Sequence, residues 1–158
     1  MTTAIRLTGV AASDGVAVGP VFVHSPGPLT PSRENIEAGS EETEIARFRE
    51  AVKTVVGKLA EMGKRIEEGG GESEAAIFEA HAEMAEDPDL HEEVEERVKN
   101  LESPEAAVLA VGEEFASMFA GMSDEYMAAR ADDVRDVTSQ IAAELIGGEA
   151  AGLEALET

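Results

Sequence analysis

The chain has 158 residues, of which 34 are acidic and 12 basic, so its formal net charge at pH 7 is -22. This length suffices for one domain with a hydrophobic core, or for one domain and part of another. The negative charge repels nucleic acids and anionic membrane surfaces, so we expect neither as a partner. The absence of cysteine excludes a disulfide framework and a thiolate metal site, and since no apolar run reaches the roughly 18 residues of a membrane span, we expect a cytoplasmic protein.

The excess of acidic residues admits two interpretations. It could form a docking surface for a basic partner, or it could serve general solubility. The even spread of Asp and Glu and the scarcity of lysine favour the second, and a salt-adapted organism fits this composition. In molar salt the Debye length is only about 3 Å, so docking there would depend on short-range apolar contacts.

The chain opens with extended structure and a connector. Residues 5–23 carry short β-branched runs punctuated by glycine, as in Gly15-Val16-Ala17-Val18-Gly19, and predict one or two short strands. Residues 24–40 contain Pro26, Pro28 and Pro31, which are incompatible with a helix interior, so this stretch is expected to be a connector.

A long amphipathic helix is predicted from about Glu41 to Glu68. Its large apolar residues recur at alternating steps of three and four, which places them along one stripe. They are Ile45, Phe48, Val52, Val55, Leu59, Met62 and Ile66. Gly69-Gly70-Gly71 then ends the helix, because glycine adopts the left-handed closing conformation without steric cost.

Four further helices are predicted. The second covers about residues 73–86, and the third and fourth open at Asp87-Pro88 and Ser103-Pro104, where a capping residue precedes a proline in the first turn. Gly121 and Ser123 end the fourth. The fifth begins near Asp124 and closes at Gly147-Gly148. The expected fold is therefore mainly α, a bundle of about five helices preceded by one or two short strands.

The three histidines are the ordinary candidates for phosphoryl transfer or acid–base chemistry. His24 and His91 are expected to be surface residues, whereas His81, on a short helix, could be a half-buried polar contact at a docking face. Metal chemistry fails on spacing, since neither His-Glu-x-x-His nor Glu-x-x-His occurs. The triple glycine follows a helix and lacks the Lys-Ser/Thr of a phosphate-binding loop.

Two segments carry a family resemblance. Residues 77–90 read IFEAHAEMAEDPDL, and residues 124–136 read DEYMAARADDVRD. Both resemble enzyme I of the phosphoenolpyruvate-dependent sugar phosphotransferase system, which moves phosphate from phosphoenolpyruvate to the small carrier HPr. A third segment, LTGVAASDGVAVG at residues 7–19, is similar to the strand pair that opens this family, with Asp14 in place of the usual proline.

The resemblance implies a division of the chain. Residues 1–24 would be the first strands of a swivelling α/β phosphohistidine domain, incomplete in this sequence. Residues 25–146 would form a helical subdomain that binds HPr, and residues 147–158 a linker returning toward the α/β domain.

The resemblance also implies a set of HPr-binding residues on the two segments. Methionine, leucine and tyrosine would offer apolar contact area, and the carboxylates would complement basic groups of the carrier. By position they are Glu72, Glu79, His81, Met84, Asp87, Asp89 and Leu90 on one side of a groove, and Tyr126, Met127 and Arg130 on the other.

No catalytic residue is implied within these 158 positions. The family's phosphorylated histidine lies in a Gly-Gly-x-x-Ser/Thr-His motif, which does not occur here. We therefore expect this chain alone to be inactive and to bind no cofactor, although magnesium is expected for the full-length enzyme. Dimerisation would require regions outside these residues.

Three alternatives to a piece of enzyme I remain. The chain could be the enzyme I-like region of a dihydroxyacetone kinase phosphotransfer subunit, or a stand-alone adaptor that binds a carrier without transferring phosphate. It could also be a structural acidic bundle. Whether the reading frame continues into the histidine motif separates the adaptor from enzyme I and from the dihydroxyacetone kinase subunit.

Overall fold

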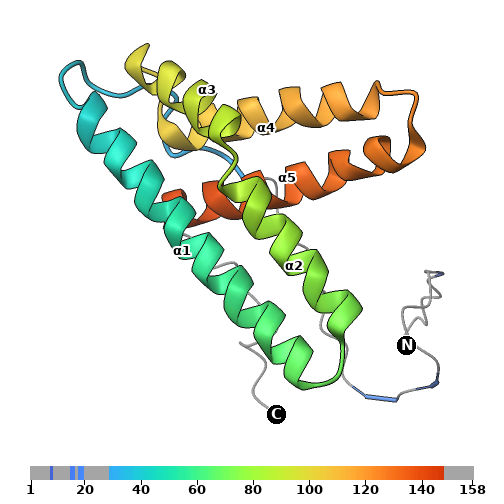
Figure 1. Ribbon diagram of the computed structural model, residues 1–158. Coiled ribbons are helices and arrows are strands. Elements are labelled where there is room, and N and C mark those ends of the chain that lie inside the picture. The colour runs from blue at the N-terminus through green and yellow to red at the C-terminus, as the bar shows by residue number, and fades with distance from the viewer. Residues whose placement is uncertain (1–7, 9–14, 17, 20–28, 148–158) are drawn as a thin grey trace, which may run out of the picture.

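The computed structural model describes residues 8, 15–16, 18–19 and 29–147, and the regular structure in this part of the chain is entirely helical (Figure 1). The prediction of a mainly α fold with five helices is confirmed. The one or two strands predicted within residues 5–23 fall largely outside the described residues, and the described positions among them form no strand. The helices are α1 (Glu41–Glu68), α2 (Glu72–Ala85), α3 (Pro88–Lys99), α4 (Pro104–Ala120) and α5 (Glu125–Ile146).

The helix ends follow the capping signals in the sequence. A carboxylate oxygen of Asp87 accepts hydrogen bonds from the backbone N–H groups of Asp89 and Leu90 at 2.8 and 3.2 Å, at the start of α3. Ser103 caps α4 in the same way, and Asp124 caps α5. These side chains satisfy N–H groups that have no partner within the helix.

Two helical hairpins cross each other. Helices α1 and α2 run antiparallel, and the antiparallel pair α4 and α5 lies across them, with the short α3 packed between α1 and α4 (Figure 1). Helix α5 contacts both α1 and α2. The core fills the crossing, and its fully buried side chains include Phe48, Val94, Val98, Val108, Val111, Val137 and Ile141. No described helix is long and apolar enough to cross a membrane.

The close approach of α4 to α5 requires a glycine. A Cβ atom on Gly112 would lie only 2.2 Å from Oγ1 of Thr138, well inside van der Waals contact. The Thr138 hydroxyl is itself fixed, because it donates a hydrogen bond of 2.8 Å to the carbonyl oxygen of Val134. The two helices therefore meet at a point where no larger residue fits without moving one of them.

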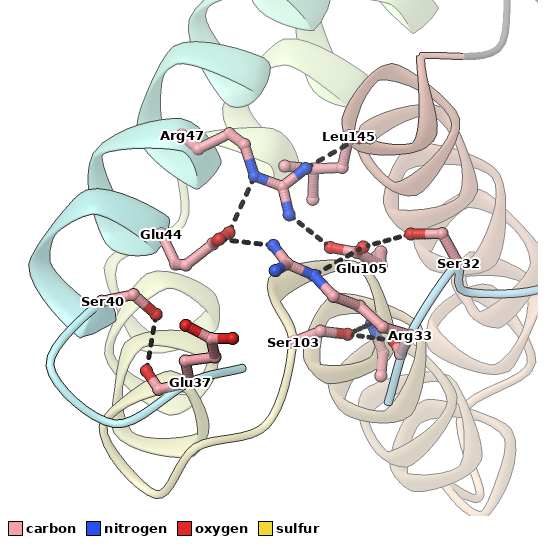
Figure 2. Close-up of polar contacts among 10 residues, drawn as sticks. Ser32, Arg33, Glu37, Ser40, Glu44, Arg47, Ser103, Glu105 and Leu145 are labelled. Atoms are coloured by element: carbon pink, nitrogen blue, oxygen red, sulfur yellow. Dashed lines mark hydrogen bonds and ion pairs between the residues drawn. The ribbon is translucent and has the colours of Figure 1, made fainter. Parts of the chain in front are cut away.

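A buried carboxylate lies at the open end of this hairpin, where α4 begins. Glu105 in the first turn of α4 is only 1 % exposed. It accepts hydrogen bonds from Ser32 Oγ at 2.9 Å and from Arg47 Nη2 at 2.6 Å, and Arg33 Nε lies 3.8 Å away (Figure 2). A buried carboxylate is tolerated only when it is paired in this manner.

Glu44 of α1 extends the same network. It accepts hydrogen bonds from Arg33 Nη2 and from Arg47 Nε, the second at 2.8 Å, and Arg47 Nη1 donates to the carbonyl oxygen of Leu145 at 2.8 Å. The Glu44–Arg33–Glu105–Arg47 network thus joins the connector to α1, α4 and the last turn of α5 (Figure 2).

The network shifts the titration of Glu44. Burial alone would raise the pKa of this carboxyl group, but the hydrogen bonds from Arg33 and Arg47, with the charges of both guanidinium groups, outweigh it and lower the pKa below 4.5. Since the folded state favours the ionised form, Glu44 stabilises the fold above pH 4.5, and the contribution is lost as the pH falls through the lower, folded-state pKa.

We predict that Gly112→Ala destabilises the protein by about 1–3 kcal/mol, because the added methyl group overlaps Thr138. Gly57→Ala is the matched control: Gly57 lies in α1 with no heavy atom within 4 Å of the added Cβ, so it should stabilise by about 0.5–1 kcal/mol. Urea unfolding followed by circular dichroism measures both. Equal effects of the two substitutions would show that α4 and α5 do not pack as described.

We also predict a pH-dependent effect of Glu44→Gln. At neutral pH the variant should be less stable by about 1.5–3 kcal/mol, as expected for lost hydrogen bonds to charged groups. The deficit should shrink as the pH falls from about 4.5 through the lower, folded-state pKa, because the wild-type carboxyl group is protonated first in the unfolded and then in the folded state. Thermal unfolding from pH 7 to pH 3 measures the difference.

The control for this prediction is Glu50→Gln, which changes the charge equally at a residue whose side chain is 71 % exposed. Its effect should stay within about 0.5 kcal/mol at every pH. A deficit of Glu44→Gln that remained constant down to pH 3 would contradict the lowered pKa.

Candidate functional site

A groove of about 380 Å³ lies between α2 and the first turns of α5. Its two large apolar side chains are unusually accessible: Ile77 is 53 % and Tyr126 is 67 % exposed. Exposed large apolar side chains gathered around a hollow are typical of an interaction site. The residues that line this α2–α5 groove are Ala76, Ile77, Ala80, Tyr126, Ala129, Arg130 and Asp133.

Helical spacing explains how these residues meet. Ala76 and Ala80 are one turn apart on α2, and Tyr126, Arg130 and Asp133 succeed one another by turns along α5. The alanines leave the space open because they carry only a methyl group. The groove is therefore a direct product of small residues on the facing sides of two helices.

Tyr126 is held by Arg130 on its own helix. Arg130 Nη2 donates a hydrogen bond of 2.6 Å to the tyrosine hydroxyl, and the guanidinium carbon lies 5.1 Å from the ring centroid. Arg130 Nη1 is also 3.8 Å from Asp133 Oδ2. The hydrogen bond to Tyr126 is the main cause that raises the pKa of the Arg130 guanidinium above its ordinary value, so this group stays charged.

His81 connects the two helices behind the groove. Its side chain is only 13 % exposed, and Nε2 lies 3.4 Å from Asp133 Oδ1. Within the described part of the chain, this buried nitrogen makes no hydrogen bond of good geometry. His81 is thus a half-buried polar residue that approaches the groove through Asp133, and its place at a docking face stays a prediction.

The predicted HPr-binding residues are divided between the α2–α5 groove and other positions. Tyr126 and Arg130 line the groove, and His81 lies beside it. Met127 is half-buried at the start of α5. The carboxylates of Glu72, Glu79 and Asp89 are exposed, the first two on α2 and the third at the start of α3.

Three predicted residues lie elsewhere. Met84, Asp87 and Leu90 line a separate cavity of about 70 Å³ together with aromatic and aliphatic side chains of α4 and α5. Leu90 is 3 % exposed and belongs to the core, and Asp87 is engaged as the cap of α3. These positions support the corner between α2 and α3, so Leu90 in particular offers no accessible contact area.

Sequence reasoning missed most of the groove, since only Tyr126 and Arg130 among its lining residues were predicted. Ile77 lies inside the segment that carries the resemblance, yet it was not among the predicted binding residues, and neither were the three alanines or Asp133. Helical spacing could have indicated Ile77, because it is one turn before His81. Asp133 gave no signal of its own in a sequence with 34 acidic residues.

His91 differs from the prediction of a surface residue. Its side chain is half-buried, with Nε2 2.8 Å from the carbonyl oxygen of Ala85 and the ring packed edge-on against Phe48 at 5.4 Å. It therefore has a structural role at the corner between α2 and α3. His24, the other histidine expected at the surface, lies outside the described residues.

The surroundings of the groove are acidic. Helix α2 carries Glu72, Glu74, Glu79 and Glu83 and has no lysine or arginine. Such a surface complements basic groups on a partner and orients it during encounter. Among the described residues, no three His, Asp or Glu side chains converge as a metal site would require.

Comparisons with known sequences agree on one family. The model of the family described as PEP-utilising enzyme, N-terminal, matches residues 8–130. Phosphoenolpyruvate-protein phosphotransferase of Staphylococcus carnosus (strain TM300) is 35% identical over 145 residues, which are 91% of this chain and 25% of that protein. The protein of the same name from Listeria innocua is 34% identical over 143 residues, with 90% and 25% covered. The chain spans about a quarter of the length of these relatives.

Two solved structures share the fold. The NMR solution structure of Enzyme I (nEIt) superposes with a TM-score of 0.74 at 36% identity, covering 83% of this chain and 53% of that one. The N-terminal domain of Enzyme 1 - Nitrogen gives a TM-score of 0.66 at 27% identity, covering 73% and 50%.

Proposed function

The chain belongs to the family of N-terminal regions of PEP-utilising enzymes, and from this premise we propose that it is the N-terminal part of a phosphoenolpyruvate-protein phosphotransferase, enzyme I. In this proposal the helical unit docks the carrier HPr, so that phosphate can pass from an enzyme I histidine to HPr during sugar uptake in the cytoplasm. The observation that carries the docking role is the α2–α5 groove with its exposed Ile77 and Tyr126.

The groove has the composition of a binding hot spot. Ile77 offers apolar contact area, and Tyr126 is an aromatic anchor held by Arg130. Tyrosine and arginine are among the residue types that contribute most to the binding energy of protein interfaces. The carboxylates on α2 would attract and orient basic residues around the histidine of HPr. Exposed apolar contacts would then supply affinity, and charge would supply orientation.

The domain division follows from the same proposal. Residues 25–146 would be the HPr-binding unit, with residues 1–24 and 147–158 leading to the phosphohistidine domain. The phosphorylated histidine would come from that domain, since phosphoryl transfer needs donor and acceptor held in line. The similar proteins carry the name phosphoenolpyruvate-protein phosphotransferase, and a similar solved structure carries the name Enzyme I, which supports this proposal over a dihydroxyacetone kinase subunit or a non-catalytic adaptor.

We predict that Ile77→Ser weakens the binding of cognate HPr by about tenfold, because it removes exposed apolar area that the partner would cover. Stability should change by less than about 0.5 kcal/mol, since the side chain is half exposed. Isothermal titration calorimetry and urea unfolding measure the two effects. Met62→Ser is the control: Met62 is 48 % exposed on α1, outside the groove, and its substitution should leave the affinity unchanged.

Equal affinities of the Ile77→Ser and Met62→Ser variants would place the HPr contact away from the groove. No binding of HPr by the wild-type chain would reject the docking role itself.

We further predict that this chain is not phosphorylated by phosphoenolpyruvate in the presence of magnesium, because its sequence lacks the Gly-Gly-x-x-Ser/Thr-His motif. Phosphate incorporation under alkaline conditions, which preserve phosphohistidine, is the measurement. Full-length enzyme I of Staphylococcus carnosus should be labelled in the same assay and serves as the positive control. A stable phosphohistidine on the chain, at any of its three histidines, would overturn this prediction.

A further inference from the structure

Asp133 is the one acidic residue among those that line the α2–α5 groove in the described part of the chain. It lies on α5 one turn after Arg130 and two turns after Tyr126, so the three side chains share one face of the helix. Its side chain is 35 % exposed. No enzymatic step and no partner contact assigned above uses it.

The two oxygens of this carboxylate face different helices. Oδ1 lies 3.4 Å from His81 Nε2 on α2, and Oδ2 lies 3.8 Å from Arg130 Nη1 on α5. His81 Nε2 is buried and lacks a hydrogen bond of good geometry in the described part of the chain. Asp133 is therefore placed to restrain Arg130 and to complete the environment of His81 at the same time.

The restraint matters because Tyr126 is exposed. A tyrosine that is 67 % exposed in the first turn of a helix would sample several rotamers unless something held it. Arg130 holds it through the 2.6 Å hydrogen bond to the hydroxyl and through stacking on the ring. Ordering a rotamer-rich side chain on binding costs about 0.5–1.5 kcal/mol, so an anchor that is ordered beforehand binds more tightly.

We propose that Asp133 is a positioning residue of the groove: its carboxylate orients Arg130 and thereby fixes Tyr126 in the rotamer that receives the partner. This inference rests on the docking function proposed above. It assigns Asp133 no contact with HPr. Its effect passes through Arg130 to Tyr126, which makes the residue important for affinity although its carboxylate oxygens face His81 and Arg130.

The competing explanation is charge alone, in which any acidic residue near the groove attracts a basic carrier. Asp132 separates the two explanations. It is the adjacent residue, its side chain is 90 % exposed, and its ion pair is with Arg135 and not with the groove. Asp132→Ala removes the same charge as Asp133→Ala and leaves the restraint on Arg130 intact.

The first measurement does not involve a carrier. Tyr126 is the only tyrosine of the chain, so NMR of protein labelled with ring-¹³C tyrosine reports this side chain alone. In the wild type and in Asp133→Ala, side-chain coupling constants give the χ1 populations, and circular dichroism confirms the fold. We expect a single rotamer in the wild type and in Asp132→Ala, and averaging over rotamers in Asp133→Ala. A single unchanged rotamer in Asp133→Ala would overturn the proposal.

The second measurement is the affinity for cognate HPr. Asp133→Ala should weaken binding by about tenfold and Asp132→Ala by less than about twofold. In a Tyr126→Ala background, Asp133→Ala should have no further effect on affinity, because a residue that acts through Tyr126 has no effect once that side chain is removed.

Equal losses of affinity for Asp132→Ala and Asp133→Ala, or additive losses with Tyr126→Ala, would contradict the positioning role and would leave the docking function standing. Failure of the wild type to bind would reject the docking function, and the rotamer measurement would still decide the role of Asp133.

Discussion

The arrangement of the helices depends on two carboxylates that are removed from water. Glu44 and Glu105 are both buried, and they are paired with Arg33 and Arg47. Desolvated charges are costly unless each finds its partner, so this network permits few alternative placements of the segments that carry it. Because Arg47 also binds the carbonyl oxygen of Leu145, the C-terminal end of α5 is fixed against α1. The opposite end of α5, with Tyr126, is then directed toward α2, where the groove forms.

The second constraint is the contact of Gly112 with Thr138, which sets how closely α4 and α5 pack. Together with the ion network it makes α5 a rigid element fixed along its length, by the network at its last turn and by α4 near its middle. A binding site built on such an element is more precise than one built on loops, since its side chains inherit the position of the backbone. The groove can therefore present exposed apolar residues without depending on them for stability.

Much of the fold followed from the sequence because its signals are local. Apolar periodicity located the helices, and capping residues such as Asp87 and Ser103 gave the starts of α3 and α4. The site was predicted less completely because periodicity does not tell which face of a helix meets another helix. Leu90 was therefore placed at the docking face although it is in the core, and Asp133 was missed because one carboxylate among many has no distinguishing local pattern. The long-range ion network was equally invisible, since Ser32 and Glu105 are 73 residues apart.

The claim that the α2–α5 groove receives the carrier is tested most directly by paramagnetic relaxation enhancement. A spin label is attached to a cysteine introduced beside the histidine of HPr. Because this chain has no cysteine, the label cannot react with it and marks the carrier alone. The account predicts that the NMR signals of Ile77, Ala80 and Tyr126 are broadened most. Strongest broadening outside the groove, at the α1 and α3 residues Arg49, Lys53 and Glu95, or no broadening at all, would contradict it.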